Sequence, residues 1–179
     1  MVPLTHLVVG YLFSKTYCEM LGIPCGSEQA FTAVTIISSV FPDIDIFFGK
    51  KINEHRNTIF HAPIFWISFT TILIIYCFFN NSFLPYSVAL GFGVFSHIFL
   101  DWFSGRTIGI RLFYPFSKKM YSLFPLNPAM GNVSFLPNKN DQEKYLKFLG
   151  NYFNNPFLAL AEVGIYIIFL LTFVSRALQ

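Results

Sequence analysis

The sequence contains few charged residues. Only 12% of its 179 residues are Asp, Glu, Lys or Arg, against roughly 25% in a typical soluble domain. Positions 62–96 contain none at all. A soluble domain needs charged side chains to cover its surface, so this scarcity excludes an ordinary soluble fold and favours an integral membrane protein. The net charge of +3 is too small to indicate nucleic-acid binding, so no nucleic-acid partner is expected.

Cysteine is also scarce. The three cysteines, Cys18, Cys25 and Cys77, form no C-x-x-C pair, which excludes the usual cysteine-based zinc and redox motifs. Cys18 and Cys25 can form a disulfide if their loop faces an oxidising compartment, or they can remain free thiols. No Lys or Arg precedes the first apolar stretch, unlike in a signal peptide, so we expect this segment to stay in the protein.

Long apolar runs dominate what is present, since 54% of the residues are hydrophobic. They predict an all-α polytopic membrane protein with four or five transmembrane helices in one membrane domain, residues 1–179. The predicted helices cover about 3–20, 27–45, 58–79, 84–103 and 156–175. The second is stopped or kinked at Pro42. The intervening loop, 104–155, includes a short amphipathic helix over 141–153, which we expect to lie on the membrane surface.

Basic residues set the expected orientation. Ten of the twelve Lys and Arg residues lie in two loops, 49–58 and 104–155. One helical hairpin separates these loops, so both face the same side of the membrane. The positive-inside rule makes that side cytoplasmic.

His97 and Asp101 interrupt an apolar, aromatic run at the end of the fourth predicted helix, residues 91–105. They are four residues apart, which places both side chains on one face of a helix, one turn from each other. Ionisable groups are expensive inside a membrane and usually have a function there. The pair therefore indicates either a shared metal ion or a hydrogen-bonded interior pair.

Four other polar residues are expected at the same depth as this pair. His6 opens the first predicted helix, Asp43 and Asp45 close the second, and His61 opens the third. With the orientation above, all of these helix ends lie on the cytoplasmic side. The common depth predicts a metal site whose candidate ligands are His6, Asp43, Asp45, His61, His97 and Asp101.

Imidazole and carboxylate ligands suit a divalent transition metal. Zinc fits best, while manganese or iron also suit this donor set, and six candidates allow one ion or two. Taken singly, each motif has a simpler interpretation. The Asp43–Asp45 pair after Pro42 can be a turn or a cap, and either His6 or His61 can be an interfacial residue.

Further ionisable residues are candidates for other roles. Arg56, Arg106 and Arg111 can bind a phosphate through their planar guanidinium groups, or can serve only as topology signals. Glu54 and Glu162 are candidate general bases. Glu162 lies six residues into the last apolar helix, where a carboxylate needs a partner, so pairing with a Lys or Arg is its alternative.

Several of these motifs together resemble a known family, the YdjM-like predicted membrane-bound metal-dependent hydrolases of bacteria. The resemblance covers about residues 1–120 and the final helix, and position 62 is Ala where a small hydroxyl residue is expected. It implies a protein of the bacterial cytoplasmic membrane with hydrolase activity. The matching stretches are PLTH, FPDID, HRNTIFHAP, HIFLD and RLFYPFSKK.

The expected function is therefore metal-dependent hydrolysis of a phosphoester or ester, in a lipid or at the membrane surface, by a site that faces the cytoplasm. The alternative is a non-enzymatic metal-binding membrane protein, or a metal or proton carrier. A carrier needs polar residues that continue to the far side of the membrane. The uncharged stretch 62–96 supplies no Asp, Glu, Lys, Arg or His for such a path.

Overall fold

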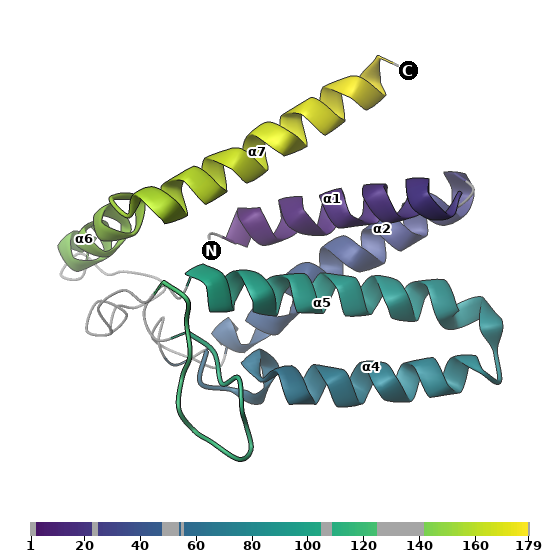
Figure 1. Cartoon of the computed structure of the whole chain (residues 1–179), viewed down its shortest axis with the longest axis horizontal. Coiled ribbons are helices and arrows are strands. Elements are labelled where there is room, and N and C mark those ends of the chain that lie inside the picture. The colour runs from purple at the N-terminus through teal and green to yellow at the C-terminus, as the bar shows by residue number, and fades with distance from the viewer. Residues whose placement is uncertain are drawn as a thin grey trace. The chain divides into compact units, whose positions relative to one another are not determined.

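A computed structural model describes residues 3–22, 25–47, 54, 56–104, 109–124 and 142–178, without the side chains of residues 21 and 25–27. Across these ranges there is no β-strand, and the only β pairing is an isolated bridge between Ile110 and Tyr121. The all-α prediction is confirmed (Figure 1). The elements in order are α1 (Pro3–Leu21), α2 (Cys25–Val40), η1 (Phe41–Phe47), η2 (Ile59–His61), α4 (Pro63–Cys77), η3 (Asn81–Phe83), α5 (Leu84–Ser104), α6 (Gln142–Phe153) and α7 (Pro156–Ala177).

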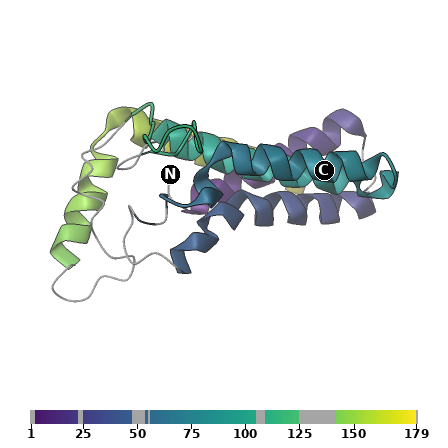
Figure 2. The same ribbon diagram turned by 90° about the horizontal axis from the view of Figure 1, so that it is seen from below.

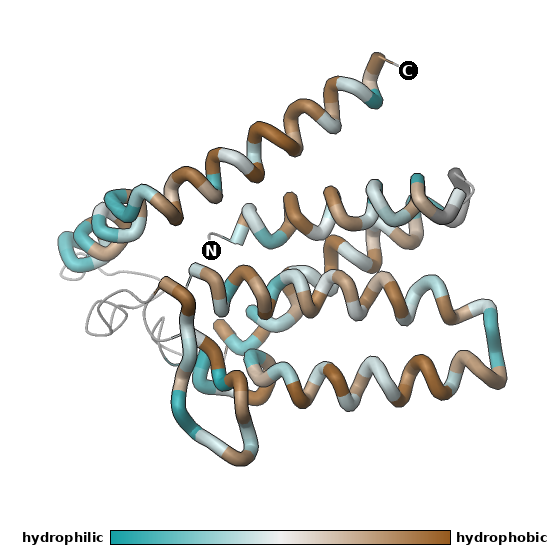
Figure 3. Tube along the Cα trace, viewed as in Figure 1, coloured by the Kyte–Doolittle hydropathy of each residue, from teal (hydrophilic) through white to brown (hydrophobic). Residues whose placement is uncertain are grey.

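Three of the described segments are long and apolar enough to cross a membrane: Glu28–Phe47, Asn81–Ser104 and Pro156–Ala177. The shorter α4 is also apolar and makes a fourth if it is counted. Figure 3 shows hydrophobic residues running along α4 and α7, whereas α6 is mostly polar. Large apolar side chains point outward on these helices. Ile72 is 64% exposed and Leu171 is 67% exposed, as expected for helices that face lipid.

The second predicted helix changes character at Pro42. The α-helix ends at Val40, and a 3-10 helix, η1, continues to Phe47. Proline has no backbone N–H for the i→i−4 bond and clashes with the preceding turn, so the α-helix cannot continue through it. The tighter η1 helix carries both aspartates, and Asp45 is buried within it.

The third predicted helix, 58–79, is divided. Thr58 caps η2 by accepting a hydrogen bond from the backbone N–H of Phe60. Pro63 then begins α4, at the first helical position that suits proline. His61 therefore lies in a short 3-10 turn before the apolar helix.

The chain forms two compact units. The first contains Pro42–Phe65 and Ile98–Glu162, and the second contains Val2–Phe41, Trp66–His97 and Val163–Gln179. In the second unit α1 packs against α2, and Cys18, Phe31 and Ala89 form a small core. Cys18 is a free, buried thiol, and the side chain of Cys25 is outside the described residues.

Small residues allow α5 and α1 to approach α2 closely within the second unit. A Cβ atom added to Gly93 would lie 2.0 Å from Ser38 Oγ and 2.5 Å from the carbonyl oxygen of Thr35. A Cβ atom on Gly10 would lie 2.6 Å from Ser39 Oγ. Such close backbone approach is how helices pack where lipid removes the hydrophobic driving force.

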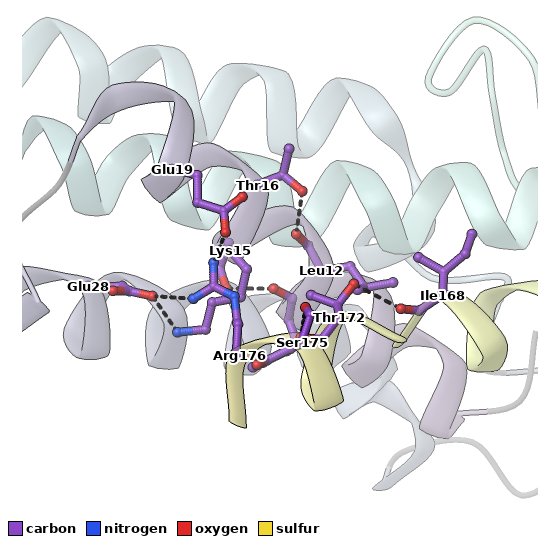
Figure 4. Close-up of polar contacts among 11 residues, drawn as sticks. Leu12, Lys15, Thr16, Glu19, Glu28, Ile168, Thr172, Ser175 and Arg176 are labelled. Atoms are coloured by element: carbon purple, nitrogen blue, oxygen red, sulfur yellow. Dashed lines mark hydrogen bonds and ion pairs between the residues drawn. The ribbon is translucent and has the colours of Figure 1, made fainter. Parts of the chain in front are cut away.

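A second feature of this unit is a group of charged residues that we name the Arg176 cluster (Figure 4). Arg176 donates through Nη2 to Glu19 and, over 3.2 Å, through Nη1 to Glu28 Oε1. Lys15 Nζ lies 2.5 Å from the same Glu28 oxygen. These contacts tie the end of α7 to α1 and α2. The cluster consists of Lys15, Glu19, Glu28 and Arg176.

In the first unit, α6 is a separate helix, drawn in light green in Figure 2, and α7 begins two residues after it ends. Phe148 and Tyr152 are buried on one side of α6. On another side Leu146 is 59% exposed and Phe153 is 50% exposed. The helix therefore has the two-sided character expected of an interfacial segment.

Candidate metal centre

His61 lies among three carboxylates of the first unit. Its Nδ1 is 3.0 Å from Asp45 Oδ2, and its Nε2 is 3.5 Å from Asp43 Oδ1 and 3.4 Å from Asp101 Oδ2. Both aspartates of η1 approach the ring because the 3-10 turns after Pro42 carry them past the end of α2. His61, Asp45 and Asp101 are buried, while Asp43 keeps 16% of its side chain exposed.

Asp45 orients the His61 ring. A carboxylate only accepts hydrogen bonds, and Asp45 Oδ2 has two neighbours, the Thr58 hydroxyl and His61 Nδ1. Both must donate, which assigns the ring proton to Nδ1. Nε2 then faces the oxygens of Asp43 and Asp101, and it offers a lone pair on that side when the ring is neutral. A carboxylate commonly accepts a hydrogen bond from the outer nitrogen of a metal-binding histidine, meaning the ring nitrogen that does not bind the metal.

His97 has an outer partner of the same kind. Its Nδ1 lies 2.8 Å from the backbone carbonyl oxygen of Ser39, which can only accept, so this nitrogen also carries the proton. The helix α5 is unbroken from Leu84 to Ser104, so His97 and Asp101 share one face, one turn apart. Both side chains are buried.

The four side chains suit a single metal ion. One ligand atom from each can be chosen so that all four lie within 4.8 Å of one another. Ligand atoms around one ion, with bonds of about 2.0–2.2 Å, are at most about 4.4 Å apart, so shifts of a few tenths of an ångström complete the fit. The two imidazole nitrogens and two carboxylate oxygens form the donor set. We name this group the metal centre: Asp43, His61, His97 and Asp101.

The two remaining predicted ligands lie beside this group. Asp45 contacts His61 through the outer nitrogen, as described above. The His6 ring stacks on the ring of His97, with centroids 4.0 Å apart and an interplanar angle of 21°. His6 is buried, and the neighbouring Thr5 hydroxyl bonds the Tyr166 hydroxyl at 3.0 Å.

The surroundings of His61 favour positive charge. Burial lowers the pKa of His61, but hydrogen bonds to Asp101, Asp43 and Asp45 outweigh it and raise the pKa to about 10. Three carboxylates around one ring thus stabilise a cation there, whether it is a proton or a metal ion. Binding of a metal at Nε2 requires release of that proton.

The other predicted functional residues are dispersed. Arg56 is 2% exposed, and its Nη2 lies 2.5 Å from Asp101 Oδ1. Arg111 is partly buried and donates to Asn57 Oδ1, so it is attached to the loop that precedes η2. Glu54 is exposed. Arg106 lies outside the described residues.

Glu162 has a phenolic partner. The Tyr152 hydroxyl donates to Glu162 Oε1 over 2.5 Å, and both side chains are buried. The alternative considered from the sequence was a Lys or Arg. The bond joins α6 to the first turns of α7.

Three partners of the predicted residues were not assigned from the sequence. The Thr58 hydroxyl, which caps η2, also bonds Asp45. Ser39 acts through its backbone carbonyl, which no residue type can signal. Tyr152 could have been considered as the partner of Glu162. It lies in the amphipathic segment only ten residues before Glu162, a carboxylate in an apolar helix that needs a partner.

Apolar helices of spanning length, together with a buried group of histidines and aspartates, define an integral membrane protein with a possible metal site. The chain belongs to the YdjM inner membrane protein family, whose model matches residues 1–177. It is therefore an inner membrane protein, and the resemblance found in the sequence is confirmed. No curated protein and no solved structure matches the chain.

Proposed function

We propose that this protein is a metal-dependent hydrolase of the inner membrane that cleaves a phosphoester or ester in a lipid or at the membrane surface. The observation that carries the proposal is the metal centre, where four donor atoms lie within 4.8 Å and each imidazole has its outer nitrogen engaged. Zinc is the proposed metal because it suits two imidazoles and two carboxylates, with manganese and iron as alternatives.

A divalent ion held there would act as a Lewis acid on a carbonyl or phosphoryl oxygen and would activate water. The chain's own residues have separate tasks. Asp45 and Ser39 hold the two imidazoles, and the 16% exposure of Asp43 marks the side of the centre open to solvent. Arg111 is the proposed contact for a substrate anion, since its guanidinium is partly exposed beside Asn57.

A general base is also proposed. Of the two glutamates considered, Glu162 is buried against Tyr152, whereas Glu54 is exposed to solvent. Glu54 is two residues before Arg56, on the loop that leads to η2. We assign it the proton-accepting role and give Glu162 a structural one.

The proposed site faces the cytoplasm, because Lys118 and Lys119 belong to the loop 104–155, whose excess of basic residues favours that side. A cysteine in place of exposed Lys118, in a chain that also carries Cys25→Ser, is a direct test, because the Cys18 and Cys77 thiols are buried. A membrane-impermeant maleimide should label it only after the inner membrane is opened. Labelling of intact spheroplasts would reverse the orientation.

The competing proposal is a non-enzymatic metal-binding protein or a carrier. The described residues 62–96, which include all of α4 and most of α5, contain no Asp, Glu, Lys, Arg or His. A transport path needs such groups along its length, so their absence favours a one-sided site. A metal-loaded protein that hydrolyses no substrate would favour this alternative.

The test combines metal analysis with a hydrolysis screen. The protein purified without chelators should contain a divalent transition metal and cleave a phosphoester or ester in vesicles. Asp43→Asn removes a ligand charge while keeping the side-chain shape, so metal affinity should fall 100-fold or more, together with turnover. Glu143→Gln is the matched control. In the described structure the Glu143 carboxylate pairs with Lys147 on the surface of α6, where both side chains are exposed.

Metal analysis separates the possible results. A folded wild-type protein with no bound metal would overturn the metal-dependent mechanism. Unchanged metal content in Asp43→Asn would show that this carboxylate is no ligand.

A further inference from the structure

Arg56 is the most deeply buried of the Lys and Arg side chains described in the first unit. Its guanidinium is 2% exposed, and its Nη2 lies 2.5 Å from Oδ1 of Asp101, which is itself 1% exposed. A group that binds a substrate anion must be accessible to that anion. The burial of Arg56, and its bond to an aspartate of the metal centre, indicate a different task.

The two oxygens of Asp101 face different partners. Oδ1 accepts from Arg56, while Oδ2 lies 3.4 Å from His61 Nε2, the nitrogen that faces the centre. The guanidinium is planar and directional, so its bond holds Oδ1 on the side of Arg56 and leaves Oδ2 toward the centre. Arg56 cannot itself be a ligand, because guanidinium has no lone pair to offer and stays protonated.

We propose that Arg56 is a positioning residue that holds Asp101 as a one-oxygen ligand of the metal centre. This inference rests on the proposed function, because it concerns the same centre. It replaces the role of substrate contact expected for Arg56 from the sequence.

Metal binding by detergent-purified, full-length protein tests the inference. Zn²⁺ titration against a chromophoric chelator gives affinity and stoichiometry, and Co²⁺ absorption reports the coordination geometry. Wild type should bind one ion per chain. Arg56→Lys keeps the charge but loses the planar fork, so its affinity should fall 10–100-fold, still with one ion, and its Co²⁺ spectrum should change.

The matched control is Arg111→Lys. Arg111 belongs to the same unit and bonds Asn57, not a residue of the metal centre, so this variant should keep the wild-type affinity and spectrum. Melting curves of the metal-depleted proteins establish that both variants are folded. A purely structural role for Arg56 would lower the melting temperature without changing the Co²⁺ spectrum of the folded fraction.

A double-mutant cycle keeps the inference testable if Arg56→Lys folds poorly. Arg56→Gln with Asp101→Asn removes both members of the buried pair and leaves no uncompensated charge. If Arg56 acts through Asp101, the double variant should bind metal as weakly as Asp101→Asn alone. Additive losses would overturn the inference.

Other outcomes are equally clear. Equal metal affinities for wild type and Arg56→Lys, with the same Co²⁺ spectrum, would overturn the inference while leaving the metal-dependent function in place. Unchanged metal affinity with a raised KM in Arg56→Lys would return Arg56 to the role of substrate contact. A wild-type protein that binds no metal would overturn both this inference and the proposed function.

Discussion

The Arg176 cluster and the metal centre are both groups of ionisable side chains, but they differ in charge and burial. Lys15 and Arg176 balance Glu19 and Glu28, and the side chain of Glu19 is 67% exposed. The carboxylates around His61, by contrast, outnumber Arg56, the cation that contacts Asp101 in the described part of the chain, and Asp45 and Asp101 are buried.

The difference in charge separates a structural cluster from a binding site. A balanced and half-exposed cluster is satisfied by its own members and by water, and contributes little net stability. A buried excess of negative charge is unfavourable until a cation enters. Side-chain length agrees with this distinction. Lys, Arg and Glu have flexible stems, whereas Asp and His offer few rotatable bonds, which suits fixed coordination.

The largest expected effect concerns pH in the metal-depleted protein. The pKa of His61 is raised to about 10, above its unfolded value of about 6.5, so its stabilising charge is fully present below pH 6.5 and is lost as pH rises through 10. The stability advantage of wild type over His61→Gln should shrink by an amount on the order of a few kcal/mol across that window.

Thermal unfolding of both proteins at pH 6, 8 and 10 measures this change. The metal-loaded wild type is the control, since a bound ion replaces the proton and should remove the decline. A pH-independent difference between the metal-depleted proteins would show that the ring is not charged among these carboxylates, and the contrast with the Arg176 cluster would weaken.

A smaller effect is expected from Gly93→Ala, one turn before His97. The added Cβ would meet Ser38 Oγ at 2.0 Å and the Thr35 carbonyl oxygen at 2.5 Å, and the backbone atom cannot move without shifting a helix. We expect a loss of about 1–3 kcal/mol and weaker metal binding, because the contact between His97 and Ser39 depends on this spacing.

Gly91→Ala is the matched control on the same helix. Its Cβ would meet only Thr70 Cγ2, at an ordinary 3.8 Å, so the stability should be unchanged or higher through better helix propensity. Thermal unfolding and chelator competition measure the two properties. Equal behaviour of the two variants would mean that close packing at Gly93 does not support the centre.

The smallest expected effect is that of Arg176→Gln. It removes the contacts to Glu19 and Glu28, which are partly or largely exposed, so the loss of stability should be under about 1 kcal/mol and metal affinity should not change. Salt should reduce the loss further. A change in metal affinity on this substitution would remove the distinction between the two clusters.

The sequence carried enough information to predict the helices and the side chains near the centre. An uncharged run of this length is compatible only with lipid, and His97 and Asp101 are brought together by helical spacing alone. Asp43 and His61 were predicted at the same depth from the topology, because successive helices end alternately on the two sides of a membrane. These predictions rest on local periodicity and on chain direction, which residue types encode directly.

The particular contacts could not be predicted, because they depend on distances between segments remote in sequence. Nothing in the residue type distinguishes Asp43, which faces Nε2 of His61, from Asp45, which faces Nδ1. The stacking of His6 on His97 follows from the packing of α1. The burial of Arg56 could not be predicted, because a short loop has no hydrophobic periodicity that would indicate which of its side chains face the interior.

The bond between Tyr152 and Glu162 has a consequence for how the protein is made. A carboxylate in the first turns of α7 raises the cost of passing this helix from the translocon into lipid. Tyr152 leaves the ribosome ten residues before Glu162, so its hydroxyl is already synthesised when the carboxylate arrives. The order of these two residues along the chain thus places a hydrogen-bond donor beside Glu162 during biosynthesis, before the last membrane helix is released.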